Sequence, residues 1–265
     1  PTGWSGTVTP AMSGYAFTPA SRSYTDLAAD QTDQDYSGAV DTNIIAISGR
    51  VTMADGTMLA GVELDGLPNS PLTNPSGYYI DTVDYSTSFS GWSGTVTPLH
   101  EAYTFTPADR AYFGVQADQT DQDYTAALNI YTISGTVTFD GSGLADVTMT
   151  GLPSTPLTGA SGNYSDAVEH GWGGSVAPEK TGYVFSPTQN IYPNVTQDIQ
   201  NDYTAALQTH TISGTVTAGG SGLSGVTITG LPENPVTLGD GTYSGSVEYG
   251  WSGAAVPVLG GYTFT

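Results

Sequence analysis

The sequence predicts an all-β protein built from tandem β-sandwich repeats of about 80 residues. Three observations predict this class: a tryptophan motif that recurs at a nearly fixed period, alternation of apolar and hydroxyl side chains between the motifs, and glycine-rich turns at regular intervals. No stretch of the chain has the period of an amphipathic helix.

The tryptophan motif is Gly-Trp-Ser-Gly in three places and Gly-Trp-Gly-Gly in a fourth. Its tryptophans, separated by 88, 80 and 79 residues, are Trp4, Trp92, Trp172 and Trp251. A repeat of this length is large enough to hold its own hydrophobic core. Insertions near 37–46, 53–58 and 85–90 account for the longer first period. Because the motifs recur in tandem, the function should be sought in the array of repeats.

The segment from Tyr131 to Phe139 is typical of the predicted strands. Ile133, Gly135 and Val137 point to one side, while serine and threonine point to the other, which is the period of two of a half-buried strand. Two turns recur in the repeats, at 55–56, 140–141 and 219–220 and at 76–77, 161–162 and 240–241. Each repeat then has about seven short strands, which favours a Greek-key β-sandwich.

A continuous β-solenoid is the alternative architecture. Its rungs normally repeat at about 20–30 residues, far below the period seen in this chain. We therefore predict two complete sandwiches, at 43–128 and 129–207. Residues 1–42 are predicted to be the C-terminal half of a repeat and residues 208–265 the N-terminal part of another.

The two partial repeats are expected to leave unpaired strand edges and uncovered apolar faces. We expect these edges to be completed in one of two ways. Neighbouring repeats of a longer covalent array would supply the missing halves, or separate subunits would join head to tail, with the strands near 19–40 of one copy completing residues 208–265 of another.

Several motifs follow one another in the same order in each repeat: Ile-Ser-Gly-Thr-Val-Thr, Gly-Leu-x-x-Val-Thr, Ser-Gly-Asn-Tyr-Ser and Gly-Tyr-x-Phe-Ser/Thr-Pro. This order resembles the carboxypeptidase-regulatory-like (transthyretin-like, Ig-like) β-sandwich modules found in tandem on bacterial extracellular proteins. The resemblance covers essentially the whole chain and implies a spacer, an adhesive unit or an appendage of an enzyme. Related collagen-adhesin modules carry an internal Lys–Asn isopeptide bond, but a single lysine, Lys180, excludes such a bond in every repeat.

The composition fits an extracellular or cell-surface protein. The formal net charge of −21 argues against nucleic acid or an anionic membrane as a partner, because both need clusters of lysine and arginine. The absence of cysteine excludes disulfides and thiolate metal sites. No apolar run is long enough to insert in a membrane as a helix.

We expect no enzymatic activity and assign no catalytic or cofactor-binding residue. His100, His170 and His210 lie at three different points of the repeat, so they form no recurring catalytic or metal-binding set. The chain also has no nucleophile elbow, phosphate loop or His-Glu-x-x-His motif.

The best candidate for a metal site is Asp-x-x-Asp-x-Asp. It occurs twice, as Asp30, Asp33 and Asp35 and as Asp118, Asp121 and Asp123. Such an oxygen-rich loop is able to bind calcium, although alternate acidic residues of a strand also line a solvated face. In the third repeat Gln197 and Gln200 replace the first two carboxylates and only Asp202 remains. We therefore assign no metal ligand, and calcium binding is to be tested by melting experiments. Equal melting temperatures with chelator and with calcium would indicate that the negative charge serves only solubility.

The tryptophans admit two interpretations, since an exposed indole stacks on a sugar ring while a glycine-flanked indole also packs closely against backbone. Recurrence in every repeat favours the core or an interdomain contact. Tyr103 and Phe105 are two residues apart and are expected to face the sandwich interior. The two glycosylation sequons, at Asn163 and Asn194, occur in one repeat only and are treated as chance.

The sequence indicates two alternative functions. The preferred one is a structural repeat segment or subunit of an extracellular bacterial filament, stalk or sheath, which polymerises head to tail or continues as a longer tandem array. The alternative is an adhesin or carbohydrate-binding repeat array, with a glycan as its partner, attached to a surface protein or a secreted enzyme. The short spacing from Tyr124 to Ile133 leaves almost no linker and favours a semi-rigid rod.

Overall fold

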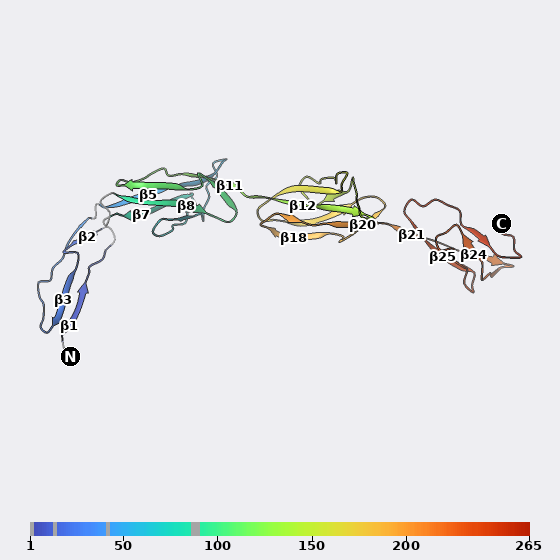
Figure 1. The fold of residues 1–265 in the computed structure, drawn as a ribbon, viewed down its shortest axis with the longest axis horizontal. Helices are drawn as coiled ribbons and strands as arrows, with labels where there is room; N and C mark the ends of the chain where they lie inside the picture. Colours follow the sequence, from blue (N-terminus) through green and yellow to red (C-terminus); the bar gives the residue numbers. More distant parts are fainter. Residues whose placement is uncertain (1–2, 13–14, 41–42, 86–90) are drawn as a thin grey trace. The chain divides into compact units, whose positions relative to one another are not determined.

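The computed structural model describes residues 3–12, 15–40, 43–85 and 91–265. The chain divides into two compact units, Pro1–Asn129 and Ile130–Thr265, which we describe separately (Figure 1). The described residues form strands, turns and loops and no helix, which confirms the predicted all-β class. Consequently no helix that would cross a membrane occurs among them.

The first unit contains a seven-stranded sandwich, the β5–β11 sandwich. Its strands are β5 (Ile44–Met53), β6 (Glu63–Asp65), β7 (Tyr78–Asp84), β8 (Trp92–Leu99), β9 (Tyr103–Thr106), β10 (Arg110–Val115) and β11 (Tyr124–Leu128). One sheet has the order β7-β5-β11-β9 and the other β10-β8-β6. Strand β11 runs parallel to β5, whereas its other neighbour, β9, is antiparallel. The predicted number of strands is confirmed.

Alternating side chains of these strands build the core. On β5, Ile45, Ile47 and Val51 are buried, whereas Arg50 is exposed. Tyr124 of β11 is 1% exposed, and its hydroxyl donates to the carbonyl oxygen of Val96 at 3.1 Å. Burial of a large aromatic ring with a satisfied hydroxyl joins the two sheets at this point.

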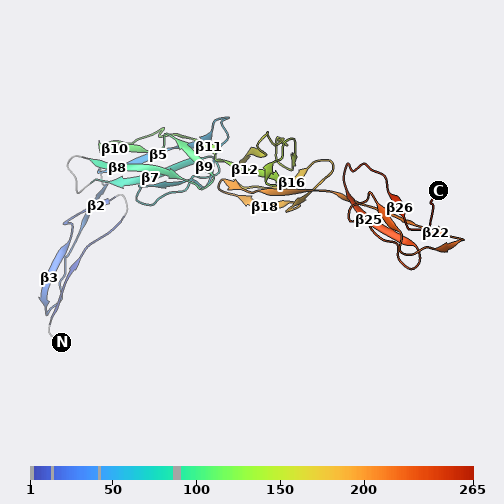
Figure 2. The same ribbon diagram turned by 45° about the vertical axis from the view of Figure 1, so that its right-hand side comes forward.

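The second unit repeats this arrangement in the β12–β20 sandwich. Its strands are β12 (Ile130–Phe139), β13 (Ser142–Gly143), β14 (Thr148–Thr150), β15 (Asn163–Glu169), β16 (Trp172–Glu179), β17 (Tyr183–Ser186), β18 (Asn190–Val195), β19 (Ile199–Gln200) and β20 (Tyr203–Leu207). Strands β15, β19 and β20 all pair with β12, and β14-β16-β18 forms the opposite sheet. Figure 2 labels β12 of the first sheet and β16 and β18 of the second. Ile133 and Val137 are fully buried, which confirms the predicted face of this strand.

A buried threonine ties a loop to the core in three repeats. The threonines Thr73, Thr158 and Thr237 are each at most 4% exposed. In the β12–β20 sandwich, Thr158 Oγ1 accepts from Val147 N at 3.0 Å and donates to Leu144 O at 2.6 Å. The hydroxyl therefore satisfies two main-chain groups that have no strand partner there.

The Gly-Leu-Pro motif supplies a backbone conformation that other residues rarely adopt. Gly66, Gly151 and Gly230 have φ angles of 92°, 91° and 90°. At each of these glycines a Cβ would collide with the carbonyl of the neighbouring strand, for example that of Ser175 at Gly151. Glycine is required at this turn for both its φ angle and its closeness to the sheet.

The β21–β26 segment, residues 208–265, has three two-stranded sheets. Its strands are β21 (Thr209–Thr215), β22 (Thr217–Ala218), β23 (Ser221–Gly222), β24 (Thr227–Thr229), β25 (Thr242–Glu248) and β26 (Val256–Val258). The pairs are β21-β25, β22-β23 and β24-β26. Val226, Ile228, Leu231 and Val247 form a smaller core than in the two sandwiches.

The β1–β4 segment at the start of the first unit contains β1 (Trp4–Val8), β2 (Tyr15–Thr18), β3 (Arg22–Leu27) and β4 (Ser37–Val40). Strand β1 pairs with β3 and β2 with β4, as β8 pairs with β10 and β9 with β11. None of the described residues up to Val40 is buried. The division of the chain into four parts, at 42/43, 128/129 and 207/208, stays a prediction.

Candidate functional site

The Asp-x-x-Asp-x-Asp loop of the β5–β11 sandwich lies along strand β5. Asp118 Oδ1 accepts a hydrogen bond from Ala46 N at 2.8 Å, and Asp123 Oδ1 accepts one from Arg50 N at 2.7 Å. Between them the main chain of Gln119 bonds to β5 in both directions, with distances of 2.8 Å and 2.9 Å. The two carboxylates therefore extend the pairing of β5, and Asp121 occupies the turn between them with a φ of 56°.

We call such a pair of carboxylates, which accept hydrogen bonds from the main chain of the first strand, the clamp. The third repeat has the same clamp, although its sequence motif does not indicate it. Asp198, not residue 197, accepts from Thr132 N at 2.8 Å, and Asp202 accepts from Thr136 N at 2.8 Å. The first carboxylate has moved by one residue along the chain, although it reaches the same main-chain position. Only the pairing with the first strand of the sandwich reveals this equivalence.

These carboxylates do not gather round a common point. In the parts of the chain that the structure describes, no three histidine or acidic side chains are grouped closely enough to hold a metal ion. Asp30, Asp33 and Asp35 lie in an exposed loop, where the carbonyl of Asp35 accepts from Arg22 Nη2 at 2.8 Å. Binding of calcium stays a prediction for melting experiments.

The hydrogen bonds of the clamp predict that the sandwich becomes less stable in acid. Hydrogen bonds from the Thr136 hydroxyl and main chain lower the pKa of Asp202 below its ordinary value of 3.8. Because the folded pKa is the lower one, the stabilisation is present above pH 3.8 and is lost as pH falls through the folded pKa. In Asp202→Asn the amides of β12 should therefore exchange faster at pH 7, and the difference from wild type should shrink as the pH falls below 3.8. Asp140→Asn, in an exposed turn, is the control, and a difference that persists unchanged in acid would contradict the clamp.

The tryptophans pack against their own sandwiches. Trp92 and Trp172 are partly buried against the cores, with ring centroids 5.5 Å and 5.9 Å from Tyr112 and Tyr192. Each indole folds back over the glycine two residues after it: a Cβ on Gly94 would lie 2.6 Å from Trp92 Cζ2. This arrangement favours the packing interpretation over a free sugar platform in these two sandwiches. Trp4, 53% exposed, is the least covered of the four.

Gly174→Ala should disturb this packing. The added Cβ would lie 2.7 Å from Trp172 Cζ2, so the indole must move, and we expect a loss of about 1–3 kcal/mol in the unfolding free energy. Hydrogen exchange in β16 and β18 would report it. Gly159→Ala is the matched control because its Cβ would meet only one atom, at 3.9 Å. Equal exchange in the two variants would show that the glycine does not seat the indole.

Two of the histidines belong to a recurring ring pair. Tyr131 and His170 have ring centroids 6.0 Å apart, and His210 and Tyr249 have centroids 6.3 Å apart. The two pairs occupy equivalent positions with the partners exchanged between strands. His100 instead packs edge-on against Tyr103, at 5.1 Å. The histidines of the described residues thus pack against tyrosine rings.

The remaining singled-out residues lie apart. Asn163 and Asn194 are exposed on β15 and β18. Lys180 Nζ donates to Ala145 O at 2.8 Å, which fixes a loop of its own sandwich. Tyr103 and Phe105 are partly buried against the core, as expected.

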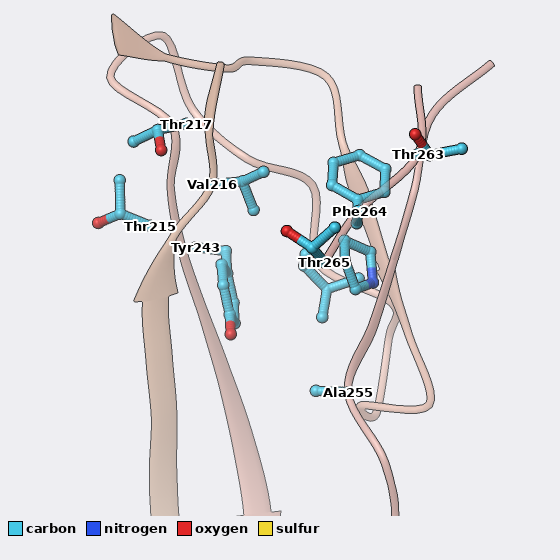
Figure 3. A pocket seen from close by; sticks show the side chains of 10 residues that line it. Thr215, Val216, Thr217, Tyr243, Ala255, Thr263, Phe264 and Thr265 are labelled. Carbon is cyan, nitrogen blue, oxygen red and sulfur yellow. The ribbon is translucent and has the colours of Figure 1, made fainter. Parts of the chain in front are cut away.

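A groove of about 380 Å³ lies in the β21–β26 segment. Figure 3 shows Val216, Tyr243, Ala255 and Phe264 around this open space. Ile228 also lines the groove. The sequence signal that marks it is a set of core positions, because its walls are the counterparts of residues buried in the complete sandwiches.

Comparison with known proteins places the chain among tandem β-sandwich proteins. No family model matches it. Among curated proteins, it is 31% identical over 204 residues to "Chitinase ChiA" of Flavobacterium johnsoniae, and the match covers 72% of this chain and 13% of the chitinase. The chain therefore spans only a small part of that protein's length.

Solved structures support the fold. The TIE protein of Bacillus anthracis matches with a TM-score of 0.54 and 12% identity, over 87% of this chain and 49% of that one. The major pilin subunit BcpA of Bacillus cereus matches over 77% and 84% of the two chains, with 8% identity and a TM-score of 0.36. At these identities the likeness concerns architecture, and the second match is too loose to carry an argument. The described strands form two complete β-sandwiches in tandem, and the TIE protein match agrees with this all-β architecture.

Proposed function

We propose that this chain is a structural repeat segment or subunit of an extracellular bacterial filament, stalk or sheath. The observation that carries the proposal is the direct connection of one sandwich to the next. Asn129 alone separates β11 from β12, and Gln208 alone separates β20 from β21. A linker of one residue gives little freedom to adjoining domains.

Both connecting residues are also held by hydrogen bonds. Asn129 N donates to Ala102 O at 2.8 Å, and Gln208 N donates to Gly182 O at 2.8 Å. The same connection therefore occurs at two successive boundaries. Repetition of one short connection supports the proposal of a stiff array, since each added residue of linker would add bending freedom.

The chemistry of the surface supports a structural role outside the cell. The net charge of −21 and the hydroxyl-rich strand faces favour solubility and disfavour nucleic acid and membrane insertion. In the complete sandwiches the clamp carboxylates pair with main chain, and the tryptophans and histidines pack against aromatic rings. We therefore propose a non-enzymatic protein whose partners are neighbouring repeats or copies of itself.

The second candidate is an adhesin or carbohydrate-binding repeat array attached to a surface protein or a secreted enzyme. The resemblance to a chitinase over 72% of this chain favours it. The match covers 13% of the chitinase, so a segment shared with a much longer enzyme fits that observation.

A glycan array that includes chitin oligosaccharides would distinguish the two candidates. We expect no saturable binding by the structural array. Saturable binding that Trp92→Ala removes, while hydrogen exchange shows β8 and β10 still folded, would favour the second candidate. Denaturing electrophoresis of native material would then separate subunits of about 27 kDa from a longer covalent array.

A further inference from the structure

We infer that the groove of the β21–β26 segment binds a β-strand of the type Asp-Tyr-Thr-Ala-Ala-Leu, with the strand's tyrosine in the groove. This site lies beyond the proposed structural role, because it is a binding activity that a peptide in solution would show. In the two complete sandwiches the equivalent groove is filled by such a strand.

The filled groove of the β12–β20 sandwich defines the occupant. Tyr203, 1% exposed, enters from β20 and donates its hydroxyl to Val176 O at 2.9 Å. In the β5–β11 sandwich, Tyr124 does the same with Val96 O. The counterpart of Val176, 79 residues along, is Ala255, which lines the groove in Figure 3.

A tyrosine hydroxyl on a second wall of the groove has a hydrogen-bond partner in both complete sandwiches. Tyr164 Oη donates at 2.7 Å to the carbonyl of Asn201, two residues before Tyr203, and Tyr79 Oη donates at 2.7 Å to the carbonyl of Gln122. Their counterpart is Tyr243, whose side chain faces the open space in Figure 3. The occupant's chain just before its tyrosine thus meets a donor already in place.

The strand edge beside the groove is also able to pair with an added strand. Val137 of β12 is the parallel partner of Tyr203, and it is fully buried. Its counterpart, Val216, lies between β21 and β22, which pair only with β25 and β23 in residues 208–265. Such an edge adds a strand through main-chain hydrogen bonds, and the side-chain pocket selects which strand binds.

One segment beside the groove differs from its counterpart in the β12–β20 sandwich. Tyr183–Ser186 forms β17 by antiparallel pairing with β20. The equivalent residues 262–265 are not in a strand, although Phe264 still packs toward the core. A bound strand would give both sides of the groove a partner, the β21–β22 edge on one side and residues 262–265 on the other.

The test uses the whole chain and a synthetic peptide of residues 187–208. Hydrogen exchange should show saturable protection of residues 215–218 and 262–265. A Tyr203→Ala peptide should bind at least 10-fold more weakly, and Ala255→Asp in the chain should weaken binding of the original peptide similarly. Ala255 is exposed, so this variant keeps the fold intact. Measurement at 0.15 M salt limits repulsion between the acidic partners.

The outcomes separate this site from the proposed filament. Equal binding of the two peptides, or no protection at any peptide concentration, would overturn the inference whether or not native fibres exist. If the chain self-associates through Tyr36, which occupies the equivalent motif position, the peptide should dissociate the complex. A complex that persists in excess peptide would also contradict the inference.

Discussion

Tyr203→Ala is expected to lower the unfolding free energy of the β12–β20 sandwich by about 3–5 kcal/mol, the typical cost of removing a large buried ring. Tyr203 is 1% exposed and joins the two sheets through its contact with the carbonyl of Val176. Hydrogen exchange of β12 and β16 would measure the loss within this sandwich, separately from the rest of the chain.

Graded variants test the cause of that loss. Tyr203→Phe keeps the ring and removes the buried hydroxyl that donates to the carbonyl of Val176, so we expect a cost of about 1–3 kcal/mol. Tyr36→Ala is the matched control, because Tyr36 has the same motif position but is only partly buried. Equal effects of the changes at Tyr203 and Tyr36 would contradict the role of burial.

Thr158→Val should also be severe, at about 2–5 kcal/mol, although valine has nearly the same shape. The change removes the hydroxyl that pairs with Val147 N and Leu144 O, and leaves two main-chain groups without a partner. Exchange of the Val147 amide should rise first, because its hydrogen bond is lost directly.

Thr204→Val is the control for this substitution, since Thr204 is an exposed residue of β20. We expect its effect to stay within about 0.5 kcal/mol. A loss at Thr158 no larger than at Thr204 would show that the buried hydroxyl does not stabilise the loop.

Much of the fold could be predicted from patterns that depend on neighbouring residues in the chain. The alternation of Ile133 and Val137 with polar residues identified a strand and its buried face, and the turn glycines identified the bends. Gly141 and Gly220 adopt the positive φ expected there, at 74° and 82°. These signals are local, so a single sequence contains them.

The features that could not be predicted depend on pairing between distant segments. Asp198 replaces Asp118 although it is displaced by one residue, because the carboxylate has only to reach the first strand's main chain. Similarly, the exchange of Tyr131 and His170 for His210 and Tyr249 preserves a ring pair across two strands. Because the histidines lie at different points of the repeat, the sequence pattern does not reveal this pair.

The groove could be predicted in part. The motifs indicated that residues 208–265 hold the first strands of a repeat, which predicts an uncovered face. Which atoms would meet an added strand required the structure, since the carbonyl of Ala255 and the ring of Tyr243 come together only when β25 and β26 lie on opposite sheets.

Electron microscopy of producing cells, with gold-labelled antibody raised against this chain, tests the structural function most directly. The account predicts label at regular intervals along fibres, stalks or a sheath outside the cell. Label confined to soluble secreted enzyme, with no labelled fibrous material, would contradict it.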